Sequence, residues 1–410
     1  MAGSLDHIKV LDLSRVLAGP WATQILGDLG AEVIKIERPI TGDDTRGWGP
    51  PYIKDAQGHD AAAAYYVMTN RNKKSIAIDI AMPEGQDIVR NLIAQSDVVV
   101  ENYKADGLKK YGLDYDSIKK LHPGIVYCSI TGFGQTGPYA HKPGYDLIAQ
   151  AMAGLMSVTG NPPGTPGDDP MKVGVGVSDL FTGLYATVGI LAALRHKEKT
   201  GEGQHIDVAL LDTTIAMMTN MAQNFLVSGQ VPTRIGSAHV NIVPFGTFEV
   251  QDGHIIVTVG NDTQFRRLCQ VLGAPHLADD SRFHTNSARV THRAKTNAAL
   301  KPLFMQHKQL ELIAALEAAL VPVGPIYTVD QVFEDPQVKA RNIVKHTDAG
   351  GGIQAQIVRN PLVMSGTPIE RIQAPPMLGE HTTDILSRLL SLSPEAIADL
   401  TARGIVGDKT

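Results

Sequence analysis

The chain has 410 residues and a formal net charge of −5 at pH 7. Because this length exceeds the size at which one hydrophobic core usually stops growing, two domains are expected. The composition, 43% hydrophobic and 19% charged, is typical of a soluble globular protein, and the acidic balance argues against nucleic acid or an anionic membrane as a partner.

The first 200 residues alternate between strand and helix signals. The strand-like runs are rich in Val and Ile and nearly continuous in apolar character, as expected when helices cover both faces of a sheet. Helices of about a dozen residues separate them, which indicates crossovers in a parallel, doubly wound sheet. The expected strands are 7–14, 31–38, 74–80, 97–103 and 124–134, and the expected helices are 20–30, 84–96 and 113–121.

The stretch 174–194, GVGVSDLFTGLYATVGILAAL, follows as a further strand and an apolar helix. Beyond residue 205 the pattern changes, and 207–229 is typical of one long helix. The dipeptide Asp252-Gly253 between two alternating apolar runs predicts a β-hairpin over 245–262. Further helical patterns occupy 263–272, 297–320 and the C-terminal segment SPEAIADLTARGIV.

These elements predict an α/β protein with a large Rossmann-like domain, whose sheet is parallel, and a smaller α+β domain. The expected limits are 1–205 and 325–410 for the large domain, 206–229 for a linker helix and 230–324 for the small domain.

Cysteine and histidine usage bears on metal sites and on the compartment. Cys128 and Cys269 provide neither a disulfide framework nor a thiolate site, which suits a reducing compartment. The 14 histidines form no H-E-x-x-H motif, so no metal is expected. The N-terminus has no signal-peptide core, and the longest uncharged apolar run, 180–194, is shorter than the roughly 20 residues that span a bilayer. We expect a cytoplasmic protein with no membrane partner.

Two common motifs are incomplete. Glu37 ends the second strand, where a ribose-binding acid would lie, but the preceding turn SRVLAGP has one glycine and not the G-x-G-x-x-G that a nicotinamide cofactor needs. GVSDL at 176–180 resembles the nucleophile elbow G-x-S-x-G, yet Leu180 replaces the second glycine. Neither an oxidoreductase nor a Ser178 hydrolase is favoured.

Asp179 lies where the strand-like run 174–178 meets the apolar helix. A carboxylate at a helix start ordinarily accepts bonds from backbone N–H groups and offsets the dipole, which stabilises the helix by about 1 kcal/mol. Two features favour chemistry. Asp179 would follow a parallel strand, where open α/β sheets bind ligands, and the small flanking residues GVGVS and TG leave clearance for a bulky substrate. The same N–H donors could steady a developing oxyanion.

A second turn-rich segment, GPYAHKPGYDLIAQA at 137–151, places Asp146 at the start of another helix. Capping is again the simplest role for this carboxylate. Lys142 and Lys110, taken alone, are typical of solvated surface charges.

Taken together, these segments resemble a known family. The chain is similar to the class III coenzyme A transferases, the family of formyl-CoA transferase, carnitine CoA-transferase and α-methylacyl-CoA racemase, and most of all to the succinate/glutarate dicarboxylate CoA-transferases. The matching segments are VLDLSRVLAGPWATQILGDLGAEVIKIERP (10–39), GDDTRGWGPP (42–51), NRNKKSIAIDI (70–80), DVVVENY (97–103), SITGFGQTGPY (129–139), GYD (144–146), VSDLFTGLYA (177–186), KTGEGQHIDVALLD (199–212), GSAHVNIVPF (236–245), PFGTF (244–248), GND-QF (260–265) and LGEHT (378–382).

The resemblance implies a Rossmann-like domain built from both chain ends, and an interlocked homodimer with active sites between domains of different subunits. It implies that Asp179 attacks the acyl-CoA thioester to give an acyl-aspartyl anhydride and CoA thiolate, after which further anhydride and aspartyl-CoA thioester intermediates transfer CoA to an acceptor acid. This chemistry needs an ionised carboxylate, which a helix N-terminus favours, and the exclusion of water. CoA esters are then substrates, with no permanently bound cofactor.

The resemblance also assigns site residues. Asp146 matches a second acidic active-site residue of formyl-CoA transferase. The distal carboxylate of an acceptor wants a cation or donors, for which Arg15, Arg46 and His239 are candidates. The positions that match the family's CoA contacts are Val16, Arg38, Ile78, Asn102 and Lys110, with Lys142 as a partner for the diphosphate.

Departures from the family pattern narrow the reaction. The racemase branch pairs its aspartate with a histidine in a GHD motif, whereas this chain has Tyr145, and a phenol is a poor base at neutral pH. Formyl-CoA transferase has a glutamine where Leu17 stands and a glycine-rich loop where this chain has 236–244. We therefore expect a CoA-transferase acting on succinyl-CoA and on glutarate, itaconate, malate or a similar acid, with racemisation and nucleotide-dependent oxidoreduction as the alternatives.

Overall fold

The computed structural model describes residues 3–54, 57–348 and 354–407. The chain forms two compact units. The first comprises Met1–Ala153, Val173–Met218 and Lys339–Thr410, and the second comprises Gly154–Lys172 and Thr219–Val338. The second unit therefore includes a segment before residue 205, and the chain returns to the first unit at Lys339 and not at 325.

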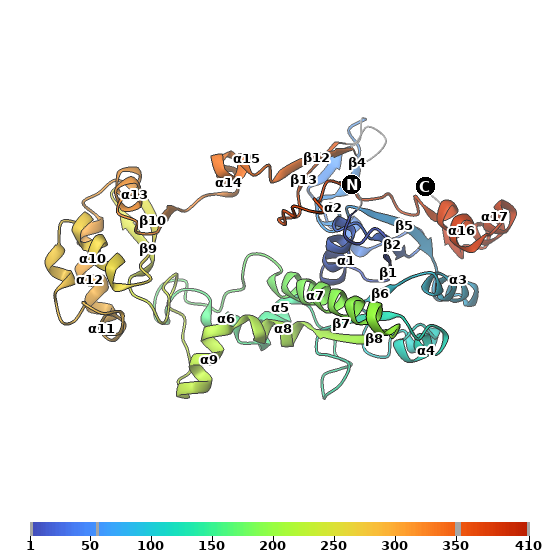
Figure 1. Cartoon of the computed structure of the whole chain (residues 1–410), viewed down its shortest axis with the longest axis horizontal. Coiled ribbons are helices and arrows are strands. Elements are labelled where there is room, and N and C mark those ends of the chain that lie inside the picture. Colours follow the sequence, from blue (N-terminus) through green and yellow to red (C-terminus); the bar gives the residue numbers. More distant parts are fainter. Residues whose placement is uncertain (1–2, 55–56, 349–353, 408–410) are drawn as a thin grey trace. The chain divides into compact units, whose positions relative to one another are not determined.

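A seven-stranded sheet organises the first unit (Figure 1). Its strand order is β14-β5-β2-β1-β6-β7-β8, and every pairing is parallel except that of β14 with β5. Without β14, this is the 3-2-1-4-5-6 order of a Rossmann sheet, so the predicted α/β class is confirmed. The strands are β1 (Lys9–Asp12), β2 (Glu32–Glu37), β5 (Lys73–Ile78), β6 (Val98–Glu101), β7 (Val126–Thr131), β8 (Gln204–Ala209) and β14 (Val406–Gly407).

Neighbouring residues of a strand point to opposite faces of this sheet, and helices bury both faces. Val10 packs with α1 (Ala18–Asp28) and α7 (Val177–Thr200), whereas the next residue, Leu11, belongs to the core on the other face. The helices of that other face are α3 (Pro83–Ala94), α4 (Tyr115–Leu121), α16 (Thr382–Leu390) and α17 (Pro394–Ala402).

The region around Asp179 differs from expectation. The strand expected at 174–178 is absent: residues 173–176, directly before α7, have no strand pairing. The predicted long helix at 207–229 is also wrong: residues up to Ala209 pair with β7 as β8, and helices α8 (Leu210–Met217) and α9 (Thr219–Ser228) follow. Pairing on the sheet edge overrides local helix propensity there.

Among the described residues, α7 is the helix that is long and apolar enough to cross a membrane, judged by length and composition alone. It instead packs on the sheet, where Ala186, Ile190 and Ala193 are buried. Its Gly183 allows close approach to α1, because a Cβ there would lie 2.6 Å from the Ala18 carbonyl oxygen.

Smaller elements complete the first unit. These are η1 (Asp44–Gly47), β3 (Tyr52–Lys54), β4 (Asp60–Ala63), α2 (Ala64–Val67), η2 (Lys109–Tyr111), α5 (Asp146–Met152), β12 (Val344–Asp348) and β13 (Gln354–Val358).

The second unit contains the predicted hairpin, with β9 (Phe245–Val250) antiparallel to β10 (Gly253–Thr258), joined by β11 (Val323–Pro325). Its core includes Phe265, Leu300 and Leu316. The expected helix at 297–320 is two helices. The helical elements are α6 (Leu155–Val158), α9, α10 (Asp262–Val271), η3 (Pro275–Ala278), α11 (Asn286–Thr291), α12 (Arg293–Phe304), α13 (Gln309–Ala318) and α14 (Val329–Glu334), and α15 (Pro336–Ala340) follows at the limit between the units.

Candidate active site

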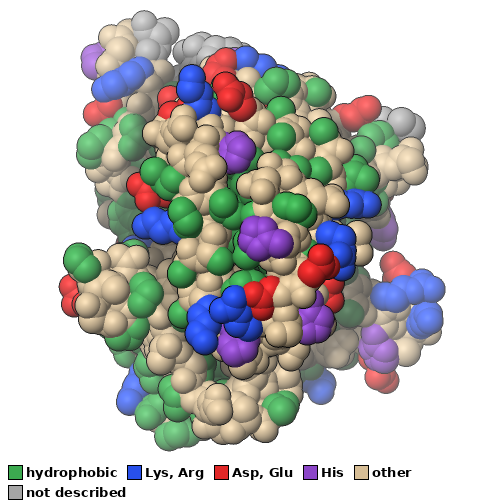
Figure 2. Space-filling view, turned by 90° about the vertical axis from the view of Figure 1, so that its left-hand side faces the viewer, with side chains coloured by type: hydrophobic (Ala, Val, Ile, Leu, Met, Phe, Trp, Pro, Cys, Tyr) green, Lys and Arg blue, Asp and Glu red, His purple; other side chains and the backbone are tan. Residues whose placement is uncertain are grey.

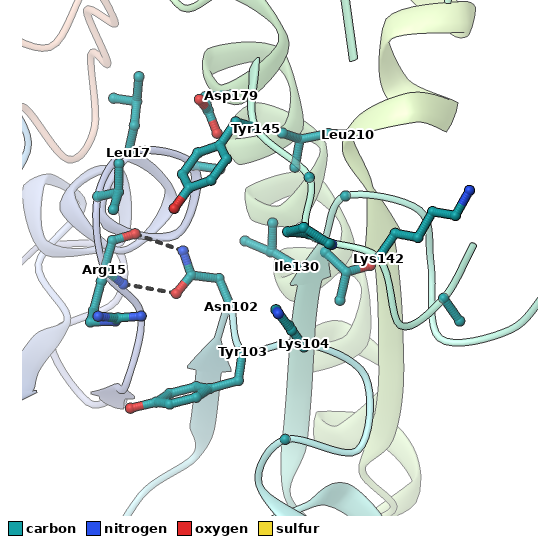
Figure 3. Close-up of a pocket in the computed structure, with 18 of the residues that line it drawn as sticks. Arg15, Leu17, Asn102, Tyr103, Lys104, Ile130, Lys142, Tyr145, Asp179 and Leu210 are labelled. Atoms are coloured by element: carbon teal, nitrogen blue, oxygen red, sulfur yellow. Dashed lines mark hydrogen bonds between the residues drawn. The ribbon is translucent and has the colours of Figure 1, made fainter. Parts of the chain in front are cut away.

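A cavity of about 430 Å³ opens in the first unit, where the chain leaves the carboxyl ends of β1, β6 and β7. The adjacent strands β1 and β6 lead in opposite directions along the sheet, which makes this the topological switch point where open α/β sheets bind ligands. Figure 3 shows the residues that line it. They come from four segments, 15–18, 102–111, 130–132 and 140–145, together with Asp179 and Leu210.

Asp179 is the third residue of α7 and faces this cavity. Gly176 occupies the N-cap, no side chain caps the helix, and the described residues give the Asp179 carboxylate no hydrogen-bond partner. The capping role is therefore not observed. Burial, and secondarily the negative charge of Asp146, raise the pKa of Asp179 to about 7. Desolvation therefore opposes the ionised form that the helix N-terminus is expected to favour.

Asp146 is the first residue of α5 and joins two helix starts. Its Oδ1 accepts a hydrogen bond from the Ser178 backbone N–H at 2.8 Å, and its Oδ2 accepts one from Gln150 at 2.7 Å. This carboxylate therefore orients the first turn of α7, next to the Asp179 carboxylate that it repels. Ser178 itself is fully buried and its hydroxyl has no partner in the described structure, which removes the basis for a serine hydrolase.

The clearance that the glycines near Asp179 were expected to give a substrate is partly filled by the protein. A Cβ on Gly176 would lie 2.9 Å from Leu17 Cδ2, and Gly183 packs against α1. Gly174 alone of these has open space around it.

Asn102 lies on the cavity wall, but its amide is occupied. Its Oδ1 accepts from the Arg15 backbone N–H at 2.9 Å, and its Nδ2 donates to the Arg15 carbonyl at 2.6 Å (Figure 3). Asn102 thus clamps the turn that follows β1. The next residue, Val16, also lines the cavity and has φ = 72°, a conformation that β-branched residues seldom adopt.

Lys110 and Lys142, two of the candidates for CoA contact, also line the cavity. Each ammonium lies over a neighbouring ring, Tyr111 at 4.6 Å for Lys110 and Tyr139 at 3.8 Å for Lys142. In Figure 3 the Lys142 ammonium points away from Asn102 and Tyr145, so it would have to turn to meet an anionic group in the cavity.

Arg38 and Ile78 line a second, smaller cavity of about 20 Å³. This cavity shares Arg15 and Tyr103 with the main one. The structure therefore brings all six predicted CoA contacts to two cavities with a common wall.

Of the three predicted carboxylate anchors, Arg46 does not line this cavity and His239 belongs to the second unit. Arg46 donates to both oxygens of buried Glu37 at 2.8 Å, to the Tyr66 hydroxyl and to the Pro376 carbonyl. Burial on its own would lower the pKa of Arg46, but Tyr66 and Glu37 more than offset this and raise the pKa above its ordinary value. His239 belongs to the second unit, where its Nδ1 accepts from the Asn241 N–H. Arg15 lines the main cavity, and its guanidinium pairs with Asp44 at 2.8 Å.

Tyr65 is a candidate that the sequence analysis missed. Burial raises the pKa of its hydroxyl, and the charges of Asp179 and Asp146 raise it further, so that the phenol stays protonated near both carboxylates. Trp48 packs against Tyr65 edge-on, with ring centroids 5.1 Å apart. Tyr65 follows the family motif GDDTRGWGPP by 14 residues, after β3 and β4. Nothing in that motif indicates that the chain then brings a tyrosine within the electrostatic influence of Asp179.

The described residues contain no group of three or more His, Cys, Asp or Glu side chains that could hold a metal ion. On the face drawn in Figure 2, basic and acidic side chains are interspersed among the described residues, with no single-sign patch.

A Rossmann sheet with a cavity at its switch point, and with the Asp179 carboxylate facing that cavity, is the arrangement of a ligand-binding α/β protein. Residues 5–382 match the model of CoA-transferase family III. The chain belongs to this family and is an enzyme of the transferase type.

Similar proteins agree with this assignment. The chain is 49% identical to the succinate–glutarate CoA-transferase of Agrobacterium fabrum over 96% of this chain and 97% of that protein. It is 42% identical to the succinyl-CoA:glutarate CoA-transferase of Homo sapiens over 98% of this chain and 90% of that protein. Among solved structures, a CAIB/BAIF family protein from Brucella suis has a TM-score of 0.81 at 47% identity, covering 95% of this chain and 100% of that chain.

Proposed function

We propose that this enzyme transfers CoA from succinyl-CoA to a free dicarboxylic acid, with glutarate as the first acceptor to test. The identity of 49% and 42% to succinate–glutarate CoA-transferases, over nearly the full length of the chain, supports the substrate pair. The observation that carries the mechanism is the Asp179 carboxylate, which faces the cavity without a partner among the described residues and has a pKa of about 7.

In the first step, an Asp179 oxygen attacks the thioester carbonyl carbon of succinyl-CoA. The C–S bond breaks, CoA leaves as a thiolate, and a succinyl-aspartyl anhydride forms. The attacking form is the ionised carboxylate, and with a pKa of about 7 for Asp179 this form is present at neutral pH alongside the protonated one. A partly desolvated carboxylate without bonded donors is a stronger nucleophile than a solvated one.

The thiolate then attacks the aspartyl carbonyl carbon of this anhydride, which releases succinate and leaves an aspartyl-CoA thioester. The acceptor carboxylate attacks that thioester, forms a second anhydride and frees the thiolate again. Attack of the thiolate on the acceptor carbonyl gives the product thioester and regenerates the Asp179 carboxylate. Every step exchanges one leaving group for one nucleophile, so no oxidant or resident cofactor is needed.

Residues around the cavity have defined parts in this scheme. Lys110 and Lys142 offer charge to the CoA phosphates at the rim, and Arg38 and Ile78 line the adjoining cavity. Arg15 is the remaining candidate in this unit for the distal carboxylate, because it lines the main cavity and its ion pair with Asp44 is exposed to solvent, whereas Arg46 lies outside that cavity and is held by buried Glu37. The Tyr65 hydroxyl is a donor near Asp179 for the oxyanion or the acceptor.

The proposal is tested by incubating the enzyme with succinyl-CoA and, separately, glutarate, itaconate, malate or oxalate, and identifying new acyl-CoA species by mass spectrometry. We expect glutaryl-CoA together with stoichiometric succinate. Absence of exchange with every acid would refute the transferase function. Loss of α-deuterium from a labelled 2-methylacyl-CoA, without acid exchange, would favour the racemase alternative.

A chemical trap tests the intermediate. Hydroxylamine cleaves anhydrides and thioesters, so it should inactivate the enzyme only when acyl-CoA is present and should leave a hydroxamate on Asp179. Inactivation at the same rate without acyl-CoA would contradict a covalent aspartyl intermediate.

The proposal includes a homodimer, interlocked as the resemblance implies, in the cytoplasm. Helix α7 exposes Leu184, Tyr185, Val188 and Leu191, with 46%, 47%, 63% and 36% of their surface accessible, and a row of large apolar side chains on one helix marks an interaction surface. Both cysteines of the described chain are buried free thiols, which suits a reducing compartment.

Light scattering should give twice the chain mass of 44.0 kDa. Differently tagged dimers should not exchange subunits unless they are first unfolded, because interlocked chains cannot separate while folded. A monomer, or rapid exchange, would contradict this assembly.

A further inference from the structure

The turn after β1 is held from beneath by buried side chains. Its residues 15–18 line the main cavity, and Val16 adopts the left-handed φ of 72°. Side chains bind several backbone groups of this turn. The Ser14 carbonyl accepts from Lys35 Nζ at 2.8 Å, and the Val16 N–H lies 3.3 Å from each oxygen of Asp43.

Lys35 and Asp43 form an ion pair below this turn, with 2.9 Å between Nζ and Oδ2, and neither side chain has any exposed surface. Burial alone would raise the pKa of Asp43, but the Lys35 ammonium and the Thr45 hydrogen bonds hold it well below its ordinary value. Burial would likewise lower the pKa of Lys35, yet Asp43 and Asp12 raise it. Both partners therefore stay charged, and each binds a different residue of the turn, Lys35 the Ser14 carbonyl and Asp43 the Val16 N–H.

We propose that Lys35 and Asp43 are positioning residues for acyl-CoA: their ion pair forces Val16 into the left-handed conformation and thereby sets the cavity wall formed by 15–18. The inference rests on the proposed function for the identity of the ligand. Neither side chain has exposed surface, so an effect on the substrate passes through the elements that the pair holds. These are the turn and, through the Asp43 hydrogen bonds from Thr45, η1; the second experiment below separates the two. A buried ion pair seldom adds net stability, so we expect this pair to have another role, and its contacts with the turn at Val16 are consistent with a positioning role.

A second buried ion pair provides a matched control. Arg71 and Asp28 are 5% and 1% exposed, and Asp28 also accepts hydrogen bonds from Asn72 and Asn360. This pair lies in the same unit but contacts neither the turn nor the cavity. Breaking it should destabilise the fold without changing the affinity for CoA.

The first experiment measures CoA binding by calorimetry and kcat/KM for succinyl-CoA in Asp43→Asn and in the doubly neutral Lys35→Met/Asp43→Asn. The double variant avoids an unpaired buried charge if the single one folds poorly. We expect CoA affinity and kcat/KM to fall about 10-fold, while Asp28→Asn, with a comparable loss of thermal stability, changes either by less than about 2-fold. Wild type that binds no CoA would refute the proposed function, whereas variants that bind CoA as wild type does would overturn this inference alone.

The second experiment tests whether the ion pair acts through Val16. Glycine adopts a φ of 72° without strain, so in a Val16→Gly background the turn needs less support. Asp43→Asn should then lower CoA affinity by only about 2-fold, against about 10-fold in the Val16 background. An equal loss in both backgrounds would show that the pair does not act through the turn.

Discussion

Replacing Asp179 by asparagine separates the chemical role of this carboxylate from its effect on stability. Asparagine has nearly the same shape but carries no charge and is no nucleophile. Acyl transfer should be abolished while CoA binding persists, because Asp179 forms one part of a cavity wall to which several segments contribute.

The effect on stability follows from the raised pKa. In the unfolded chain Asp179 ionises near 3.8, but in the folded protein only near 7. Between these values the folded state binds one proton more than the unfolded state, so the free energy of unfolding falls by about 1.4 kcal/mol per pH unit as pH rises. This stability is fully present below pH 3.8 and is lost as pH rises to about 7. From pH 5 to pH 8 the wild type therefore loses about 2 to 3 kcal/mol that the asparagine variant keeps.

The assay is chemical denaturation of both proteins at pH 5 and pH 8, with the change in their stability difference as the readout. The single-turnover rate of acyl-enzyme formation in the wild type should rise with pH and level off above about pH 7. Asp146→Asn removes the second cause of the shift and should move that profile to lower pH. A stability difference that does not change with pH would refute the raised pKa, and an active Asp179→Asn enzyme would refute the nucleophile.

Three further variants test particular contacts. Tyr65→Phe should lower kcat about 10- to 100-fold, as expected for the loss of one donor to a charged group, with CoA affinity retained. Glu101 is buried with a pKa raised to about 7, so its contribution to stability is lost as pH rises from about 4.5 to 7, and Glu101→Gln should increase the melting temperature at pH 8 more than at pH 5. Gly183→Ala places a Cβ 2.6 Å from the Ala18 carbonyl oxygen and should destabilise the protein by about 1 to 3 kcal/mol in denaturant melts.

Each of these variants has a control or a contradicting outcome. Gly174→Ala adds a Cβ with no atom within 4 Å and should leave stability unchanged. Tyr52→Phe removes a hydroxyl that donates to the Gly47 carbonyl and should retain kcat. If Tyr65→Phe does the same, the hydroxyl has no part in the reaction. An equal rise in melting temperature at both pH values for Glu101→Gln would contradict its shifted pKa.

The sheet was predictable because its strands are buried on both faces and their Val-rich runs are unmistakable. Helices between them fixed the parallel pairing, and the switch point then located the cavity. At the sheet edge the predicted helix over 207–229 was wrong in its first residues, because 204–209 pair with β7 as a strand and the helical structure begins only at Leu210. Local pattern carries no information on such a long-range pairing.

The sequence provides candidate site residues but not their electrostatic surroundings. Asp179 and the candidates for CoA contact line cavities, whereas Arg46 is held by Glu37, a partner that only the tertiary structure brings near. The pKa of Asp179 depends on desolvation and on Asp146, neither of which can be computed from spacing. Tyr65 was missed for the same reason, since its proximity to Asp179 depends on an irregular excursion.

The outer edge of β5 is covered by the end of the chain. Val406 pairs with Ile78, the His381 N–H donates to the Ser75 carbonyl, and the Ala77 N–H donates to Thr382. All six parallel strands have been synthesised by residue 209, yet this edge has no partner until the ribosome has made the segment beyond residue 381. Throughout that interval a nascent chain presents a row of unpaired backbone groups, which is a template for association with other chains. Because residues 381–407 are made after all six parallel strands, they protect this edge only late in synthesis.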